Sequence, residues 1–260
     1  MYVIILAAGR GSRLGGAVPK PLAEVAPGLS LLGNQVKVLS RLVGRHRICV
    51  VVGHEAMHVV AAHPDLMFVH NTRYATTNTA KSLLCALPKF DDDVMWVNGD
   101  LYFEEPAARL VLEQHADCSR TLVDHSKTGD EEIKYTIFPD GSIDQISKTV
   151  ERPAALGESL GLQIVTRRDR ARLQRALEAV GEKDYFERAL ELCTQDRSIR
   201  LMPVDVGRQF CMEVDFAEDL EAVRKYVAAT NVGTNAPKIA GAGAAVSEAT
   251  PDAARKPALT

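Results

Sequence analysis

The chain has 260 residues, of which 46% are hydrophobic and 25% charged, with 31 Lys and Arg against 34 Asp and Glu. This is the composition of an ordinary globular protein that can bury a sizeable core, and a net charge of −3 gives no reason to expect a nucleic-acid partner. The five cysteines are odd in number and never form a Cys-x-x-Cys pair, which argues against a disulfide framework and against a thiolate zinc site.

The N-terminal segment is a short apolar run over residues 2–8, with no basic stretch before it. It is much shorter than a membrane span and lacks the pattern of a signal peptide. We therefore expect a buried strand there. Together with cysteines that are expected to be reduced, this segment favours a cytoplasmic protein without a membrane partner.

Short runs rich in β-branched residues then alternate with segments that are apolar at three- and four-residue spacing. The runs predict buried strands over 3–6, 48–52, 67–69 and 94–97, and the segments between them predict helices over 31–42, 55–62 and 78–87. This alternation predicts an α/β fold with a Rossmann-like, mostly parallel central sheet flanked by helices. Ligands of such sheets bind at the carboxyl ends of the strands.

The middle of the chain has a different pattern. Residues 133–138 and 143–146 are joined by the turn sequence Pro139-Asp140-Gly141-Ser142, which predicts a small β-hairpin insertion. After it the pattern predicts helices over 168–180, 184–193 and 217–227, with strands over 199–204 and 210–214. Residues 230–260 are rich in Ala, Gly, Pro, Ser and Thr and lack aromatic side chains, so we expect a disordered tail behind a domain formed by residues 1–229.

The loop after the first strand carries the chemistry, in the sequence Leu6-Ala7-Ala8-Gly9-Arg10-Gly11-Ser12-Arg13-Leu14 followed by Pro19-Lys20-Pro21-Leu22. The two alanines leave room for a flat base, and the glycines let successive N–H groups face phosphate oxygens. Arg13 can grip phosphates with its planar guanidinium, and Lys20 projects from a stiff segment between two prolines. A glycine-rich turn alone would indicate only a tight turn. The string is neither a Rossmann fingerprint nor a Walker A loop.

Taken whole, these two stretches resemble the signature of the nucleotide-sugar pyrophosphorylase-like nucleotidyltransferases. Residues 71–83 are similar to the Asn-x-x-Tyr…Thr-Asn…Ser-Leu segment of the phosphocholine and 2-aminoethylphosphonate cytidylyltransferases. The resemblance implies the nucleotide-diphospho-sugar transferase type of fold and CTP as the donor. It implies Lys20 and Arg13 as catalytic residues. It implies these nucleotide-binding residues: Leu6, Ala7, Ala8, Gly9, Gly11, Asn78, Ser82 and Asp100.

Two acidic elements complete the resemblance. Asn98-Gly99-Asp100 follows the strand over 94–97, and Glu213 and Asp215 share one face of an extended segment. The resemblance implies Asp100, Glu213 and Asp215 as ligands of Mg²⁺, the expected cofactor, since carboxylates from distant strands commonly hold this ion together with triphosphate oxygens. Taken alone, Asp215 would be interpreted as the cap of the helix that follows it.

The implied reaction is attack of a phosphate or phosphonate oxygen on the α-phosphorus of CTP, with release of pyrophosphate. The attacking oxygen is already anionic, so alignment and charge neutralisation are required and a general base is not. The expected partners are CTP and a small phosphate- or phosphonate-bearing acceptor, with homodimer formation left open. The resemblance implies four acceptor-binding residues, each of which alone would be interpreted as a surface charge: Asp124, Lys134, Lys148 and Glu158.

With only 5% aromatic residues, an aromatic cage for a trimethylammonium group is hard to find, which weakens phosphocholine as the acceptor. A sugar-1-phosphate nucleotidyltransferase is the alternative enzyme. A non-catalytic nucleotide-binding module would be expected to lack Lys20 or Asp100, and both are present.

A competing interpretation from another class comes from His54-Glu55-Ala56-Met57-His58, which spells the zinc metalloprotease motif His-Glu-x-x-His. That motif requires both histidines on one face of a helix. Here it directly follows the strand over 48–52, so we expect it at a helix start, where this geometry is not available.

Overall fold

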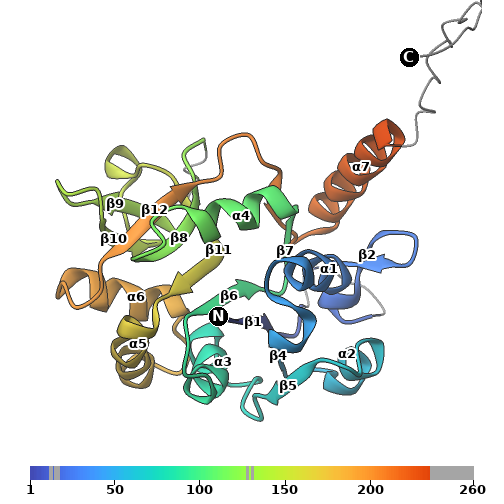
Figure 1. The fold of residues 1–260 in the computed structure, drawn as a ribbon, viewed down its shortest axis with the longest axis horizontal. Helices are drawn as coiled ribbons and strands as arrows, with labels where there is room; N and C mark the ends of the chain where they lie inside the picture. Colours follow the sequence, from blue (N-terminus) through green and yellow to red (C-terminus); the bar gives the residue numbers. More distant parts are fainter. Residues whose placement is uncertain (12–13, 15–17, 127–128, 130–131, 235–260) are drawn as a thin grey trace, which may run out of the picture.

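The computed structural model describes residues 1–11, 14, 18–126, 129 and 132–234. Its main sheet has nine strands (Figure 1), and one half of that sheet is parallel. In spatial order this half contains β6 (Val94–Asn98), β1 (Tyr2–Ala7), β4 (Ile48–Val52) and β5 (Met67–His70). The four strands predicted from the apolar runs are therefore confirmed. They are mostly apolar because helices cover both faces of this half of the sheet.

The other half of the sheet is built around β11 (Glu158–Val165), which pairs antiparallel with β6, β8 (Ser119–Asp124) and β9 (Lys134–Ile137). Strand β9 and β10 (Ile143–Ser147) form the predicted hairpin. The α/β class is thus confirmed, with a mixed sheet in which β11 introduces the antiparallel pairings.

The remaining strands form three further pairings. Strand β12 (Leu201–Asp205) runs parallel to β8 at the edge of the main sheet. Two small two-stranded sheets lie outside it: β7 (Leu101–Phe103) with β13 (Cys211–Glu213), and β2 (Glu24–Ala26) with β3 (Leu29–Ser30). The segment after β6 and the segment before the last helix are distant in the sequence. The pairing of β7 with β13 places them side by side.

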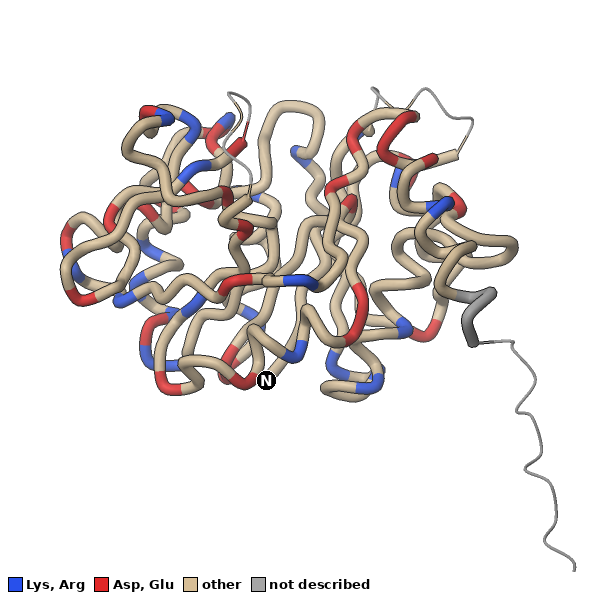
Figure 2. The backbone as a smooth tube through the Cα atoms, turned by 90° about the horizontal axis from the view of Figure 1, so that it is seen from above, with Lys and Arg blue, Asp and Glu red and all other residues tan. Residues whose placement is uncertain are grey.

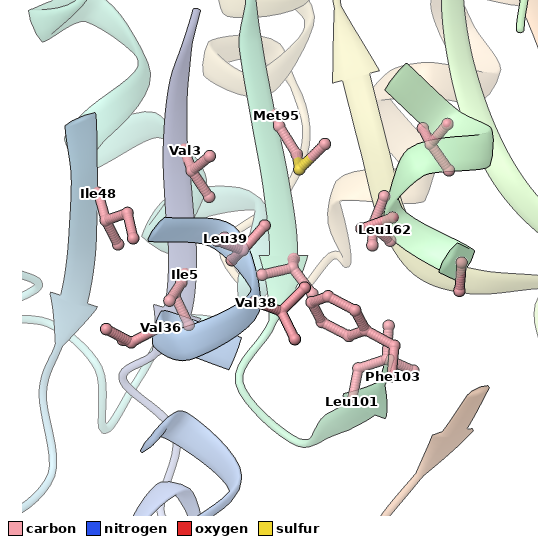
Figure 3. Close-up of a cluster of buried hydrophobic side chains, with 14 of the residues drawn as sticks. Val3, Ile5, Val36, Val38, Leu39, Ile48, Met95, Leu101, Phe103 and Leu162 are labelled. Atoms are coloured by element: carbon pink, nitrogen blue, oxygen red, sulfur yellow. The ribbon is translucent and has the colours of Figure 1, made fainter. Parts of the chain in front are cut away.

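Helices form a layer on each face of the main sheet. One layer contains α1 (Leu31–Val43), α2 (Ala56–Ala62) and α4 (Glu105–Glu113), and the other contains α3 (Thr79–Ala86), α5 (Arg167–Ala179) and α6 (Phe186–Gln195). Strand β1 alternates between them, because side chains of a strand point to opposite faces in turn. Val3 and Ile5 pack against α1, as Figure 3 shows, while Ile4 and Leu6 belong to the core under α3.

The last helix, α7 (Ala217–Thr234), lies beside β2 at the edge of the molecule (Figure 1). Leu220, Val223 and Val227 give it a buried apolar stripe that packs against Val25. The predicted helix end at residue 227 is too early, because the helix continues to Thr234. The domain boundary at residue 229 stays a prediction. The rest of the predicted tail, residues 235–260, lies outside the described residues.

Charged residues are spread along the part of the chain that the structure describes. Figure 2 shows Lys and Arg interspersed with Asp and Glu, without one face given over to either sign. Within the described part of the chain, no helix combines the length and apolar character needed to span a bilayer.

Candidate active site

The glycine-rich loop leaves β1 at Ala7 and runs directly against Lys20. Leu6, Ala7 and Ala8 are buried, and Gly11 has a φ of +58°. A Cβ built on Gly11 would lie 2.5 Å from the Cβ of Lys20, so only a glycine permits this approach. Arg13, the other predicted catalytic residue, lies outside the described residues, and its role stays a prediction.

Lys20 joins the two acidic elements. It begins a short 3₁₀ turn over Lys20–Leu22, and its Nζ lies 2.8 Å from Asp100 Oδ2 and 2.7 Å from Asp215 Oδ1. The side chain is only 11% exposed. Burial alone would lower the pKa of Lys20, but the two carboxylates outweigh burial and the pKa is raised overall. The ammonium is therefore charged at neutral pH and is shared by two carboxylates.

Asp100 is held in place by backbone contacts of its loop. The N–H of Gly99 donates to Leu6 O at 2.9 Å, and a Cβ on Gly99 would lie 2.7 Å from that same oxygen. The buried amide of Gln35 in α1 donates to Asn98 O at 2.8 Å and to Leu101 O at 2.7 Å. Helix α1 thus fixes the turn that carries Asp100 at the carboxyl edge of the sheet.

Asp215 is positioned from the other side. Val214 N donates to Asp100 O at 3.0 Å, which extends the contact between β7 and β13 to the two aspartates. Asp219 Oδ2 accepts the backbone N–H groups of Asp215 at 2.9 Å and Phe216 at 2.8 Å. Asp219 therefore satisfies the backbone at the start of α7, and the Asp215 carboxylate faces Lys20 instead.

Gln35 and Asp219 were not among the predicted site residues. A polar amide within the apolar face of α1 was a signal for Gln35. An aspartate four residues beyond Asp215 was a signal for Asp219.

The two aspartates suit a cation with oxygen ligands. Both already bind one ammonium, and Asp100 Oδ1 is buried without a hydrogen-bond partner among the described residues. An oxygen of this kind fits Mg²⁺, which takes one or two carboxylates together with phosphate oxygens. Among the described residues, no three His, Cys, Asp or Glu side chains are grouped closely enough to hold a metal by themselves.

Glu213, the third predicted metal ligand, does not share the Lys20 ammonium. Its Oε1 accepts from Asn98 Nδ2 at 3.3 Å. Glu213 is exposed to solvent. The protein around the carboxyl group and the charge of Asp100 raise the pKa of Glu213 above its ordinary value. Its role at the metal stays a prediction.

The predicted base-recognition residues lie at the start of α3. Asn78 is the N-cap, where its Oδ1 accepts from Thr79 N at 2.9 Å and its Nδ2 donates to Lys183 O at 3.2 Å. Ser82 is buried one turn later, and its Oγ accepts from Asn71 Nδ2 at 3.0 Å. The structure thus joins Ser82 to Asn71, and the Asn78 amide caps α3 and donates to the turn between α5 and α6. Their part in recognising a base stays a prediction.

The predicted acceptor residues separate into two places. Glu158 is the register partner of both Asp124 and Lys134, so β8, β9 and β11 bring these three together. Lys148 is exposed beyond β10, and its Nζ lies 5.6 Å from the ring centroid of Tyr185, which precedes α6. Whether these residues bind an acceptor is untested.

The His-Glu-x-x-His string falls across a helix start, as expected. Helix α2 begins at Ala56, so His54 and Glu55 precede it, and Glu55 has a φ of +48°. Glu55 stands between the imidazoles, with oxygens 4.0 Å from His54 Nε2 and 3.9 Å from His58 Nδ1. The two histidines do not share a helix face, so the zinc protease arrangement is not formed.

The chain is similar to a known family and to several curated proteins. The profile of the MobA-like NTP transferase domain family matches residues 3–192. The chain is 39% identical over 122 residues to the CMP-5'-(3-aminopropyl)phosphonate synthase of Streptomyces rubellomurinus, a match that covers 44% of this chain and 18% of that protein. It is 36% identical over 106 residues to the bifunctional protein GlmU of Halorhodospira halophila, covering 40% of this chain and 22% of GlmU. The matched part spans only about a fifth of the length of these curated relatives.

Solved structures show the same fold. The inositol-1-phosphate CTP transferase from T. maritima superposes with a TM-score of 0.72 at 19% identity, covering 87% of this chain and 94% of that one. The CTP:phosphocholine cytidylyltransferase LicC from Streptococcus pneumoniae gives a TM-score of 0.67 at 15% identity, covering 87% and 98%. At these identities the likeness is one of fold.

Proposed function

Because the chain belongs to the family of MobA-like NTP transferase domains, we propose that it moves CMP from CTP onto the phosphate or phosphonate of a small metabolite and releases pyrophosphate. The observation that carries the proposal is the convergence of Lys20 with Asp100 and Asp215 beside the glycine-rich loop. Phosphoryl transfer without a general base needs a fixed array of charges, and this array is present.

The choice of CTP is supported by three observations. Residues 71–83 have the pattern of the cytidylyltransferase branch, and the relative from Streptomyces rubellomurinus is named for a CMP-phosphonate product. Ala7, the last residue of β1, and Ala8 after it have small side chains, which would suit a flat base placed against the backbone.

In the proposed reaction, an acceptor oxygen forms a bond to the α-phosphorus of CTP while the bond from that phosphorus to pyrophosphate breaks. Asp100 and Asp215 would hold Mg²⁺, with Glu213 as the predicted third carboxylate, and the bound ion would neutralise charge on the phosphates. Lys20 would then give up its carboxylate partners and place its ammonium against the α-phosphoryl oxygens, where negative charge gathers during transfer.

The loop before Lys20 contributes backbone donors to the same reaction. Gly9 and Gly11 leave the N–H groups of this segment without side chains in front of them, which suits phosphate oxygens. Arg13 stays the predicted partner of the departing pyrophosphate.

The experiment is a matrix of pyrophosphate release. Each of CTP, UTP, ATP and GTP is combined with 2-aminoethylphosphonate, phosphocholine, inositol 1-phosphate and a sugar 1-phosphate in the presence of Mg²⁺. The proposal expects release with CTP and a phosphate- or phosphonate-bearing acceptor in clear excess over the purine triphosphates. Release only with a sugar 1-phosphate would move the assignment to the alternative enzyme, and equal rates with a purine triphosphate would contradict the choice of CTP.

A further inference from the structure

Helices α5 and α6 pack side by side and leave a groove of about 670 Å³ between the middle of α5 and the end of α6. Its volume is in the range of sites that hold small molecules. In Figure 1 the two helices lie on the other side of the molecule from β2, the strand that follows Lys20. The residues that line the groove are all distinct from the Lys20 cluster. The groove is therefore separate from the candidate active site.

The wall that α5 contributes is positively charged. Arg168, Arg172 and Arg175 follow one another at intervals of four and three residues, which places them on one face of the helix, and all three are exposed. Arg172 and Arg175 line the groove. Like charges at this spacing on a helix are unfavourable, so an anion bound between the two guanidinium groups would relieve their repulsion.

A single buried carboxylate serves this row of arginines. Asp169 Oδ1 lies 3.3 Å from Arg168 Nε and 3.5 Å from Arg172 Nη1, while its Oδ2 accepts from two hydroxyl groups. Arg175 forms no ion pair or hydrogen bond with a residue that the structure describes. Three guanidinium groups thus share one carboxylate, and this face of α5 keeps a net positive charge.

The remaining lining is partly apolar. Leu192 and Cys193 of α6 and Ala176 of α5 give the groove an apolar part. Asp196 is the carboxylate of the lining, and its Oδ1 already accepts the backbone N–H of Ser198 at 2.9 Å. Two guanidinium groups and one carboxylate that is bound to its own turn therefore line the groove, which leaves positive charge beside an apolar surface.

Both walls are held by contacts with the rest of the protein. Lys81 Nζ donates to three carbonyl oxygens at the end of α5, at 2.7 to 3.2 Å. Thr194 Oγ1 donates to Asp144 O at 2.7 Å, which ties the end of α6 to β10. Cys193 Sγ donates to Arg172 O at 3.9 Å and joins the two helices to each other. A ligand would therefore enter between helices that are already in place, which keeps the ordering cost of binding small.

We propose that the groove between α5 and α6 is a second binding site, for a small metabolite that carries a phosphate group on an apolar body. A phosphate presents several anionic oxygens, and guanidinium groups such as those of Arg172 and Arg175 bind these oxygens in pairs. The apolar body would lie over Ala176 and Leu192. This site is separate from the proposed transfer reaction and does not depend on it.

The test uses phenyl phosphate as the probe, with inorganic phosphate and phenol as its two halves. Each is titrated without CTP into the ¹⁵N-labelled wild-type protein, and the amide NMR shifts report where it binds. We expect phenyl phosphate to shift amides of residues 172–176 and 192–198 and to bind about tenfold or more tightly than either half, because charge and apolar contact act together. Equal affinity for inorganic phosphate or for phenol would overturn the proposal, as would shifts confined to the loop before Lys20.

A substitution then tests the role of the arginine row. Arg175→Met keeps the stem of the side chain and removes its charge, and Arg175 has no described partner whose loss would unfold the protein. The Kd for phenyl phosphate should rise by about tenfold, as expected for the loss of a hydrogen bond to a charged group.

The matched control is Arg41→Met, which removes an exposed arginine of α1 in the helix layer on the other face of the sheet. This change should leave the Kd nearly unchanged. An equal Kd in wild type, Arg175→Met and Arg41→Met would overturn the proposal. Because these titrations measure binding without CTP, their outcome is independent of the pyrophosphate assay.

Discussion

The carboxylates of the cluster around Lys20 and the carboxylate of Glu187 at the start of α6 lie in contrasting electrostatic surroundings. In the first, two carboxylates from distant parts of the chain share one internal ammonium. In the second, a more deeply buried carboxylate, Glu187, keeps an oxygen without a hydrogen bond among the described residues. Burying a polar atom without a hydrogen-bond partner costs stability, and burial raises the pKa of Glu187. The carboxylates of the Lys20 cluster are thus paired with a cation inside the protein, while one oxygen of Glu187 is buried without a hydrogen bond among the described residues.

The largest expected effect comes from removing one carboxylate of the complete cluster. Asp100→Asn keeps the shape of the side chain but lowers its affinity for a cation, so turnover should fall by on the order of a hundredfold or more. The melting temperature should change little, since the contacts that hold the turn come from Gln35 and the backbone. Steady-state pyrophosphate release and thermal unfolding measure the two quantities, and activity within a few-fold of wild type would refute the role of Asp100.

Removing the shared ammonium should reveal the resting-state pairing directly. Lys20→Met should raise the activation free energy by about 3 kcal/mol and lower turnover accordingly, as for other preorganised groups that stabilise developing charge. It also leaves Asp100 and Asp215 without that internal cation, so Mg²⁺ or Mn²⁺ without nucleotide should raise the melting temperature more than in wild type. Lys37→Met, at an exposed position of α1, is the control. Equal stabilisation of all three proteins by metal would show that Lys20 does not compete for the metal position.

A smaller effect is expected at the nucleotide base. Ser82→Ala removes the hydroxyl that accepts from Asn71, and the preference for CTP over purine triphosphates should fall by about tenfold, the value of one hydrogen bond. Competition assays with mixed triphosphates measure the ratio. Ser40→Ala is the matched change, because the hydroxyl of this partly buried serine of α1 is buried without a hydrogen-bond partner in the described structure. An unchanged ratio in Ser82→Ala would remove this residue from the base site.

The buried carboxylate of Glu187 predicts that the stability of the fold depends on pH. The pKa of Glu187 is raised to about 7 in the folded protein from an ordinary 4.5, so the folded state retains the proton over a range where the unfolded state has lost it. This lowers stability progressively as pH rises from 4.5 to 7, with no further loss above. Glu187→Gln removes the effect, and its melting temperature relative to wild type should rise by on the order of 10 °C between pH 4.5 and pH 7.5. A difference that is flat with pH would mean that Glu187 is already paired.

The smallest effect is expected for the histidine string. Replacing both His54 and His58 by Ala should leave turnover within about twofold, because neither imidazole belongs to the Lys20 cluster and surface substitutions usually change stability little. Zinc content by elemental analysis should be negligible before and after the change. Loss of activity together with loss of bound zinc would revive the protease interpretation.

Much of the fold could be predicted from local pattern. The apolar runs of β1, β4 and β6 and the spacing within α1 and α3 follow from burial on both faces of a parallel sheet, and the structure confirms them. Strand β11 could not be predicted in the same way. In this strand Gly161 has a positive φ, and the polar residues Ser159 and Gln163 are buried. The sequence therefore shows neither a continuous apolar run nor an alternation of apolar and polar residues.

The same distinction between local pattern and tertiary packing applies to individual charged residues. Lys20, Asp100 and Asp215 belong to contiguous strings, and the structure brings all three together. Glu187 follows no such string, because its meaning depends on where α6 packs against Trp96 on a distant strand. A charged residue in the first turn of an amphipathic helix indicates solvent exposure or a favourable helix dipole, and only tertiary packing makes this one buried.

The transfer of CMP to an acceptor oxygen can be tested most directly by isotope position. The purified protein is given CTP, Mg²⁺ and 2-aminoethylphosphonate labelled with ¹⁸O in its phosphonate oxygens, and the products are separated by mass spectrometry and ³¹P NMR. The account predicts a CMP-phosphonate whose bridging oxygen carries the label, together with unlabelled pyrophosphate. Formation of CMP by attack of water, with all label left in the unreacted phosphonate, would contradict it.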